Sequence, residues 1–450
     1  MVRVTDMTHG RPIRLILLFS LPLMLGSVFQ QLYTIVDTII IGRGVGMQAL
    51  ASIGAADWIN WLVLWGLQGF TQGFAILAAQ EFGAGAYDRL RRVLAMIVKL
   101  SCWFGIAVTI ISLLLVRPLL TLLHTDPAVF GGAQTYLYVQ FGGSLIIIAY
   151  NMAAAVLRCL GDSRTPLFAV IAASFANIAL DLLFVMGFGW GIFGASFATV
   201  LAQLIAFLLC LRSLRRLPFV QLTKADWKND PAILLHLCRL GIPTGLQMSM
   251  ITLGGMVLQS VLNGFGVVFV AGYTAANKLY GILESASVAF GYAMTAYMGQ
   301  NLGARNAARI DAGIRAVLVL SAEFTAAIVT AMLVAGKPLL GLFLSTEEAG
   351  AADALAVAHR YLMVLMVFLF ALFLLQAYRS SLQGLGEMTV PTLSGFAEML
   401  MRMGAALVLP TFIGQSGVFF AEGAAWVCAA ALNLVWYYMR IGKIKRDMLQ

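Results

Sequence analysis

The chain has 450 residues, of which 61% are hydrophobic and only 11% are charged, and its formal net charge is +9. A soluble globular domain carries roughly 25% charged residues, so this composition excludes that class and indicates an integral membrane protein. The excess of positive charge follows the predicted membrane topology, which argues against a nucleic acid as a partner.

Apolar runs long enough to cross a bilayer as helices recur along the whole chain. We expect about twelve such helices, because each needs about 20 residues to cross the hydrocarbon layer, and no sizeable soluble domain. Several runs exceed this length, which predicts tilted or kinked helices. Their expected limits are 12–42, 52–80, 93–116, 133–157, 166–188, 192–214, 236–263, 272–300, 312–336, 355–384, 390–412 and 417–440.

The distribution of basic residues predicts that both termini are cytoplasmic. On this topology 22 of the 29 Lys and Arg residues lie in inner segments, three lie within spans and only four lie in outer segments, namely Arg43, Arg117, Lys337 and Arg360. The first apolar run lacks a small-residue cleavage pattern, so we expect it to be a retained helix.

The five cysteines and four histidines show no ligand spacing. Each cysteine stands alone in or beside an apolar run, and no two histidines are four residues apart. We therefore expect no disulfide framework, no bound metal and no membrane metalloenzyme.

Three motifs recur in the same order at nearly one offset, which predicts an internal duplication. Pro22 recurs as Pro243, AQEFGAGA at 79–86 recurs as GQNLGARN at 299–306, and LGDSRTP recurs as LGEMTVP 225 residues later. Each half holds six spans, so we expect an all-α protein with two six-helix bundles around a central cleft, an architecture of secondary transporters. The expected limits are 1–214 for the N-terminal bundle, 215–235 for a polar cytoplasmic linker and 236–450 for the C-terminal bundle.

Several segments carry a family signature. They read QQLYTIVDTIIIGRGVGMQALASIG at 30–54, GQNLGA at 299–304, GDSRTP at 161–166 and GEMTVP at 386–391. Together they resemble the multidrug and toxic compound extrusion (MATE) family, in its DinF-like branch, over essentially the whole chain. The resemblance implies an efflux antiporter that exchanges cationic or amphipathic small molecules for H⁺ or Na⁺ by alternating access. It also implies a monomer without a cofactor, in contact with membrane lipid, in the plasma (inner) membrane of a bacterium or archaeon.

Polar residues inside the first bundle form the predicted ion-coupling site. Asn177 and Asp181 share a helical face in an apolar run, and a mid-membrane carboxylate costs roughly 2.5 to 3.5 kcal/mol. The span directions place Asp37 and Thr199 at a similar depth, so we expect all four residues to cluster. Two neighbouring carboxyls in a low dielectric can hold a proton, whereas carboxylate, amide and hydroxyl oxygens suit Na⁺, and the sequence leaves both open.

A purely structural role for these acids is the alternative. In this alternative Asp37 caps the turn at 42–44 or pairs with Arg43, and Asp181 only satisfies polar groups of a neighbouring helix.

Pro22, inside the first span, is the predicted hinge, because proline removes a helical hydrogen bond.

The second half lacks the acids that the family's NorM-like branch carries in spans seven and ten. Glu398 and Arg402, four residues apart, are expected to neutralise each other. Glu284 is predicted to handle substrate or protons, or else to be a buried partner of a polar group. The residues predicted to line the substrate cleft are Gln30, Gln31, Tyr33, Gln68, Gln72, Gln247, Glu284 and Gln376.

Two other functions compete with efflux. A lipid or lipid-linked oligosaccharide flippase would have paired bundles too, but we would expect several basic residues facing its cleft, and only Lys278 and Arg402 are expected deep in the membrane. An enzyme would need a nucleophile or metal constellation, and the sequence shows none, so no catalytic residue is predicted.

Overall fold

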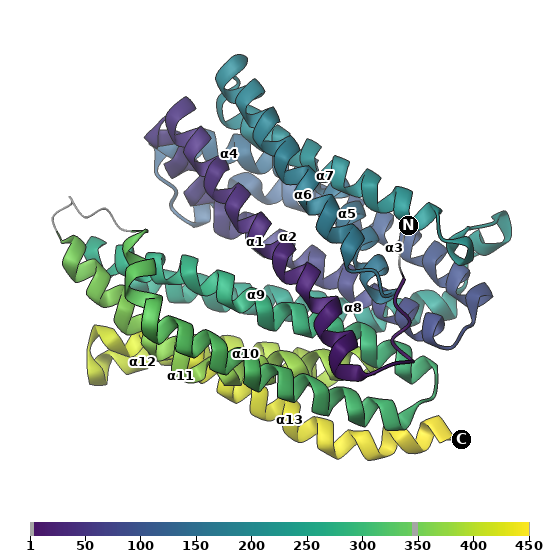
Figure 1. Ribbon diagram of the computed structural model, residues 1–450. Coiled ribbons are helices and arrows are strands. Elements are labelled where there is room, and N and C mark those ends of the chain that lie inside the picture. Colours follow the sequence, from purple (N-terminus) through teal and green to yellow (C-terminus); the bar gives the residue numbers. More distant parts are fainter. Residues whose placement is uncertain (1–3, 344–349, 450) are drawn as a thin grey trace. The chain divides into compact units, whose positions relative to one another are not determined.

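The protein is helical throughout the part that the structure describes, residues 4–343 and 350–449 of a computed structural model (Figure 1). Arg3, counted above among the inner basic residues, lies outside this part. The elements are α1 (Pro12–Gly44), α2 (Met47–Gly83), α3 (Tyr87–Leu122), α4 (Pro127–Gly142), α5 (Ser144–Cys159), α6 (Arg164–Asp181), η1 (Leu182–Gly187), α7 (Gly191–Arg215), η2 (Pro218–Val220), η3 (Lys224–Trp227), α8 (Pro231–Asn263), α9 (Val267–Gly303), α10 (Ala307–Gly341), α11 (Ala351–Gly384), α12 (Thr389–Ile413), η4 (Gln415–Phe419) and α13 (Phe420–Leu449).

The expected all-α membrane fold is confirmed. Within the described residues ten helices are long and apolar enough to span a bilayer, and the bent pair α4 and α5 makes an eleventh. Helix α9, the eighth expected span, is as long as α2 but is not among them. Helices suit this solvent because they satisfy their own backbone hydrogen bonds, and exposed side chains such as Phe412 (78%) and Leu114 (72%) suit contact with lipid tails.

Two expected spans are not straight helices. The span predicted at 133–157 consists of α4 and α5, which meet at Gly143 with a bend of 51°. The span predicted at 166–188 changes from α6 to the π-helical segment η1 directly after Asp181. A π-helical turn widens the helix and is frequent at functional sites, which makes the end of α6 a candidate site.

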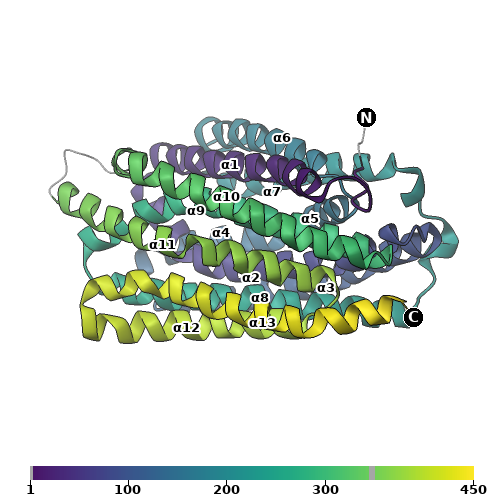
Figure 2. The same ribbon diagram turned by 60° about the horizontal axis from the view of Figure 1, so that its bottom comes forward.

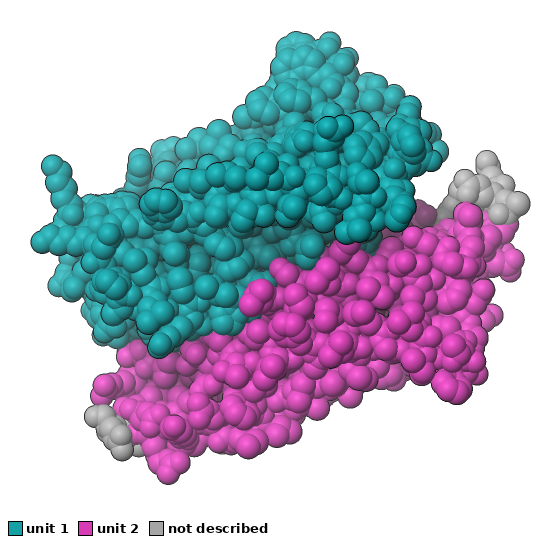
Figure 3. Space-filling view, turned by 180° about the vertical axis from the view of Figure 1, so that it is seen from behind, with its two compact units in different colours: residues 1–6, 21–245 teal, residues 7–20, 246–450 magenta. Residues whose placement is uncertain are grey.

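By contacts the described chain divides into two compact units, coloured teal and magenta in Figure 3. Unit 1 comprises residues 1–6 and 21–245, and unit 2 comprises residues 7–20 and 246–450. The start of α1 therefore belongs to unit 2, where Ser20 Oγ donates to the carbonyl of Ala289 at 3.3 Å. The bundle limits expected from the sequence stay a prediction.

Helices α1 and α8 both change unit beside an internal proline. Helix α1 passes from unit 2 to unit 1 just before Pro22, and α8 passes from unit 1 to unit 2 just after Pro243. Both helices continue without a break through their prolines. The structure shows a single conformation of each helix, so the hinge at Pro22 stays a prediction.

Close helix packing in each unit relies on small residues. In unit 1 a Cβ added to Gly73 would lie 2.6 Å from the Leu240 carbonyl oxygen, and in unit 2 one added to Gly272 would lie 2.3 Å from the Ala354 carbonyl oxygen. Small residues let membrane helices approach closely enough for van der Waals packing. In unit 2, α9 to α13 run alongside one another in both ribbon views (Figures 1 and 2).

The segment expected to be a linker packs on unit 1. Lys99 Nζ on α3 donates to the carbonyl of Trp227 at 2.5 Å and to Asn229 Oδ1 at 2.6 Å. In η3, Asp226 Oδ2 accepts hydrogen bonds from the backbone N–H and the hydroxyl of Thr223, both at 2.7 Å, and lies 3.8 Å from Arg91 Nε. Partial burial raises the pKa of Asp226, but the Thr223 hydrogen bonds and the charges of Arg91 and Arg92 outweigh it and hold the pKa below its ordinary value.

The Asp226 contacts predict how firmly the linker is held. We expect Asp226→Ala to cost about 1 kcal/mol locally, as lost capping interactions do, and to speed amide exchange at 221–229 about fivefold. Because its pKa is lowered on folding, the contribution of Asp226 is present above the ordinary Asp pKa and is lost as the pH falls through the lowered value. Hydrogen exchange mass spectrometry, corrected for intrinsic rates, measures both effects.

Asp88→Ala is the matched control. The Asp88 side chain is 85% exposed, and its removal leaves both Thr223–Asp226 hydrogen bonds in place, so exchange at 221–229 should be unchanged. Unaltered protection in Asp226→Ala would show that η3 is held by other contacts.

Candidate functional site

The buried carboxyl of Asp181 is the centre of the candidate site in unit 1. Asp181 ends α6 and is 0% exposed, and neither of its oxygens accepts a hydrogen bond from an N–H or hydroxyl group of the described residues. Asp37, from α1, interacts directly with it and has its own Oδ1 buried without a partner. The structure therefore brings together the two carboxyls that the span directions place at one depth.

The amide and hydroxyl of the predicted cluster lie at an adjacent small cavity. Asn177 is 1% exposed, and neither polar atom of its side chain has a protein partner. Thr199 Oγ1 donates to the carbonyl of Ala195 at 3.2 Å. The centre of a water molecule can occupy about 30 Å³ of this cavity, so the cavity has room for one or two waters. Its polar lining residues are Gln30, Tyr33, Tyr150, Ser174, Asn177, Thr199 and Gln203.

Sequence reasoning missed a third acid beside this pair. Asp57 on α2 is partly buried and interacts electrostatically with Asp37 and with Tyr136 of α4. The Tyr136 hydroxyl accepts a hydrogen bond from Asn60 Nδ2 at 3.2 Å. The sequence feature that could have identified Asp57 is the presence of a carboxylate inside the second apolar run, 52–80.

No basic side chain balances these acids among the described residues. The ion pair between Asp37 and Arg43, the structural alternative, is not found in residues 4–343 and 350–449, and Arg43 is exposed. The same residues hold no group of three or more His, Cys, Asp and Glu side chains suited to a metal ion. The cluster therefore carries unbalanced negative charge unless a proton or another cation joins it.

The residues of unit 1 that are predicted to line the cleft lie in different surroundings. Gln31 is exposed, and Gln68 is half-buried. Gln72 is buried, and its Oε1 accepts a hydrogen bond from Arg158 at 2.9 Å. Only Gln30 and Tyr33 of that predicted set also line the cavity near Asn177.

Unit 2 holds the three remaining predicted cleft residues. Gln247 is fully buried, and its Oε1 accepts from Gln383 Nε2 at 2.9 Å. Gln376 is half-buried on α11. Glu284 on α9 interacts with Tyr280 and with Glu422 of α13.

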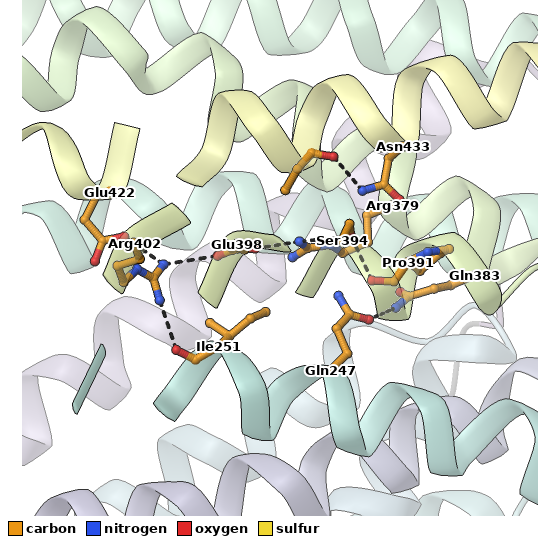
Figure 4. A network of polar contacts seen from close by, with 11 residues as sticks. Gln247, Ile251, Arg379, Gln383, Pro391, Ser394, Glu398, Arg402, Glu422 and Asn433 are labelled. Carbon is orange, nitrogen blue, oxygen red and sulfur yellow. Dashed lines mark hydrogen bonds and ion pairs between the residues drawn. The ribbon is translucent and has the colours of Figure 1, made fainter. Parts of the chain in front are cut away.

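A chain of alternating charges crosses the interior of unit 2 (Figure 4). Arg379 donates to Glu398 Oε2 at 2.6 Å, and Arg402 donates to Glu398 Oε1 at 3.1 Å and to Glu422 Oε2 at 2.8 Å. Arg402 also donates to the Ile251 carbonyl on α8 at 2.9 Å. Two acids and two arginines balance one another, and their contacts join α8, α11, α12 and α13.

The predicted pairing of Glu398 with Arg402 is confirmed, but the sequence analysis misplaced a neighbour. Arg379, counted among the inner basic residues, is 3% exposed inside unit 2. Its place near the end of an apolar run made it look like a topology signal. Glu422 was not singled out, because its partners lie on other helices.

Comparisons with known proteins agree with this architecture. The family model described as MatE matches residues 22–183 and 243–408, two stretches that begin at the repeated prolines. The chain is 31% identical to the "Probable multidrug resistance protein YpnP" of Bacillus subtilis over 99% of its own length and 98% of that protein. It is 22% identical to the "Multidrug export protein MepA" of Staphylococcus aureus, covering 94% of this chain and 93% of that one.

Solved structures share the fold. One is a MATE protein in complex with MaL6, at a TM-score of 0.91, 24% identity and coverage of 99% of this chain and 100% of that chain. Another is a MOP superfamily transporter from Pyrococcus furiosus, at a TM-score of 0.91, 24% identity and coverage of 98% and 99%.

The charge chain of Arg379, Glu398, Arg402 and Glu422 predicts that replacing one member destabilises the protein more than replacing both members of an ion pair. Glu398→Leu leaves two buried guanidiniums without their shared carboxylate, and breaking a buried ion pair this way costs about 3 to 5 kcal/mol. We expect a marked fall in the midpoint of thermal unfolding in detergent, and a smaller fall for Glu398→Leu combined with Arg379→Leu. If the double variant unfolds as early as the single one, Arg379 and Glu398 are not coupled.

Proposed function

Because this chain belongs to the MatE family of multidrug and toxic compound extrusion proteins, we propose that it is a secondary active efflux antiporter driven through the acid cluster of unit 1. Its cargo is cationic or amphipathic small molecules, and the coupling ion is H⁺ or Na⁺. The observation that carries the proposal is the fully buried Asp181 carboxyl, which accepts no hydrogen bond from an N–H or hydroxyl group of the described residues and lies next to the carboxyl of Asp37.

The energetics of that pair explain why it suits coupling. Two adjacent carboxyls in a low dielectric cannot both be ionised without a cation, because their charges repel and are poorly solvated. A proton or Na⁺ that binds there removes the repulsion, and its release restores it. A transporter can therefore use the ion's arrival and departure to favour one conformation over another.

The assignment of Asn177 and Thr199 to this site, and of Gln30, Gln31, Tyr33, Gln68, Gln72, Gln247, Glu284 and Gln376 to the substrate path, is part of the proposal. The orphaned amide of Asn177 supports it most directly. The charge chain of unit 2 disfavours the flippase alternative, since Arg379 and Arg402 are already paired and are not free for a pyrophosphate. We further propose a plasma-membrane location with both termini cytoplasmic.

Coupling should depend on the acids of unit 1. We expect Asp37→Asn and Asp181→Asn to reduce gradient-driven export of a cationic dye from proteoliposomes to passive leakage for every substrate, at normal expression. Gln376→Ala, a polar change in unit 2, is the matched control and should shift apparent affinity modestly while transport stays coupled. Full export by well-folded Asp181→Asn would disprove the coupling site.

The driving ion can be identified with imposed gradients. We expect a pH gradient without Na⁺ to drive export, because two adjacent carboxyls in a low dielectric can share one proton. An Na⁺ gradient at equal pH should then give no export. Transport that requires Na⁺ at every pH tested would instead establish the oxygen site as a sodium site.

A further inference from the structure

The two halves offer an internal comparison at one arginine. At the repeat offset of 220 residues, Arg89 at the start of α3 corresponds to Arg309 at the start of α10. In unit 2 the Arg309 guanidinium is fully engaged by the protein. Its Nε donates to Asn301 Oδ1 at 3.0 Å, and its terminal nitrogens donate to the carbonyls of Gly10 at 2.8 Å and Met7 at 2.9 Å.

Unit 1 repeats only the first of these contacts. Arg89 Nε lies 3.0 Å from Glu81 Oε1, and Glu81 is the counterpart of Asn301. The Arg89 side chain is 59% exposed in the described structure. Two guanidinium N–H₂ groups that hold oxygen atoms in unit 2 are thus available in unit 1.

A cavity of about 360 Å³ lies beside Arg89. Leu77, in its lining, stands where unit 2 has Tyr297, and the Tyr297 ring lies 5.6 Å from the Arg309 guanidinium carbon. The smaller leucine leaves space that the tyrosine ring fills in the other half.

The lining also carries basic side chains at two positions where unit 2 has apolar ones. Arg92 and His236 line the cavity at positions where unit 2 has Ala312 and Leu15. One acid, Asp230, borders the cavity as well. Its Oδ1 already accepts the N–H groups of Ala232 and Ile233, both at 3.1 Å, as the cap of α8. The cavity therefore presents two guanidiniums and an imidazole to an oxygen-bearing ligand.

We propose that this cavity binds the phosphate group of an anionic phospholipid. Guanidinium pairs suit phosphate because their N–H groups match its oxygens, and basic pockets at membrane helix ends bind acidic headgroups. A lipid is favoured over free phosphate because α8, which lines the cavity, carries exposed apolar side chains for acyl tails, Leu235 at 53% and Ile242 at 45%. The site is separate from the acid cluster and stands or falls independently of the proposed function.

Native mass spectrometry of the full-length protein tests the proposal. The protein is titrated with phosphatidylglycerol in phosphatidylcholine micelles, and the bound lipids are counted. Arg92→Ala combined with His236→Leu gives these two positions their unit 2 residues and should weaken the tightest phosphatidylglycerol site about tenfold, since it removes one guanidinium charge and one imidazole hydrogen-bond donor. Leu77→Tyr keeps every charge but fills the space, and should weaken it too.

Arg216→Ala, an exposed arginine outside the cavity, is the control and should bind as the unchanged protein does. Equal phosphatidylglycerol binding by the unchanged protein, the double variant and Leu77→Tyr would overturn the proposal. Saturation of the site by inorganic phosphate in pure phosphatidylcholine, with no further gain from phosphatidylglycerol, would overturn the assignment to a lipid.

Discussion

An ionised side chain inside a bilayer must find either a counter-charge or a mobile cation, because hydrocarbon supplies neither water nor salt. The two units meet this requirement in opposite ways. In unit 2, Arg379 and Arg402 balance Glu398 and Glu422 through contacts of 2.6 to 3.1 Å. In unit 1, no basic residue of the described chain pairs with Asp37 or Asp181. Charge is therefore balanced among these four side chains of unit 2 and left unbalanced in the acid pair of unit 1.

This division explains how a duplicated scaffold can perform an asymmetric task. A balanced ion network adds little net stability, since desolvation offsets attraction, but it penalises any rearrangement that separates its members. The network connects α8, α11, α12 and α13 and so opposes their separation. Glu284 forms none of these ion pairs but interacts with Glu422. Unit 2 therefore holds one further acid beside the network.

The sequence predicts the architecture well and the site in part. Hydrophobic runs and repeated motifs suffice for the helices and the duplication, because both are local or periodic signals. The sequence predicts that Asp37 and Asp181 lie close together, because the direction of each span fixes the depth of its residues in the membrane. It does not predict the contacts of Asp57, Arg379 and Glu422. Their partners lie on other helices, and packing sets how those helices are rotated about their own axes. The break at Gly143 and the π-helical turn after Asp181 likewise depend on neighbouring helices.

The passage of α1 and α8 between units bears on how such a chain could arise. Each half lends the start of its first helix to the other unit, and the exchange happens at equivalent prolines. The exchange has the form of a dimer with swapped arms whose two copies are joined in one chain. Gene fusion would then have preserved the swap. It follows that neither half of the present chain contains all the residues of either folded unit.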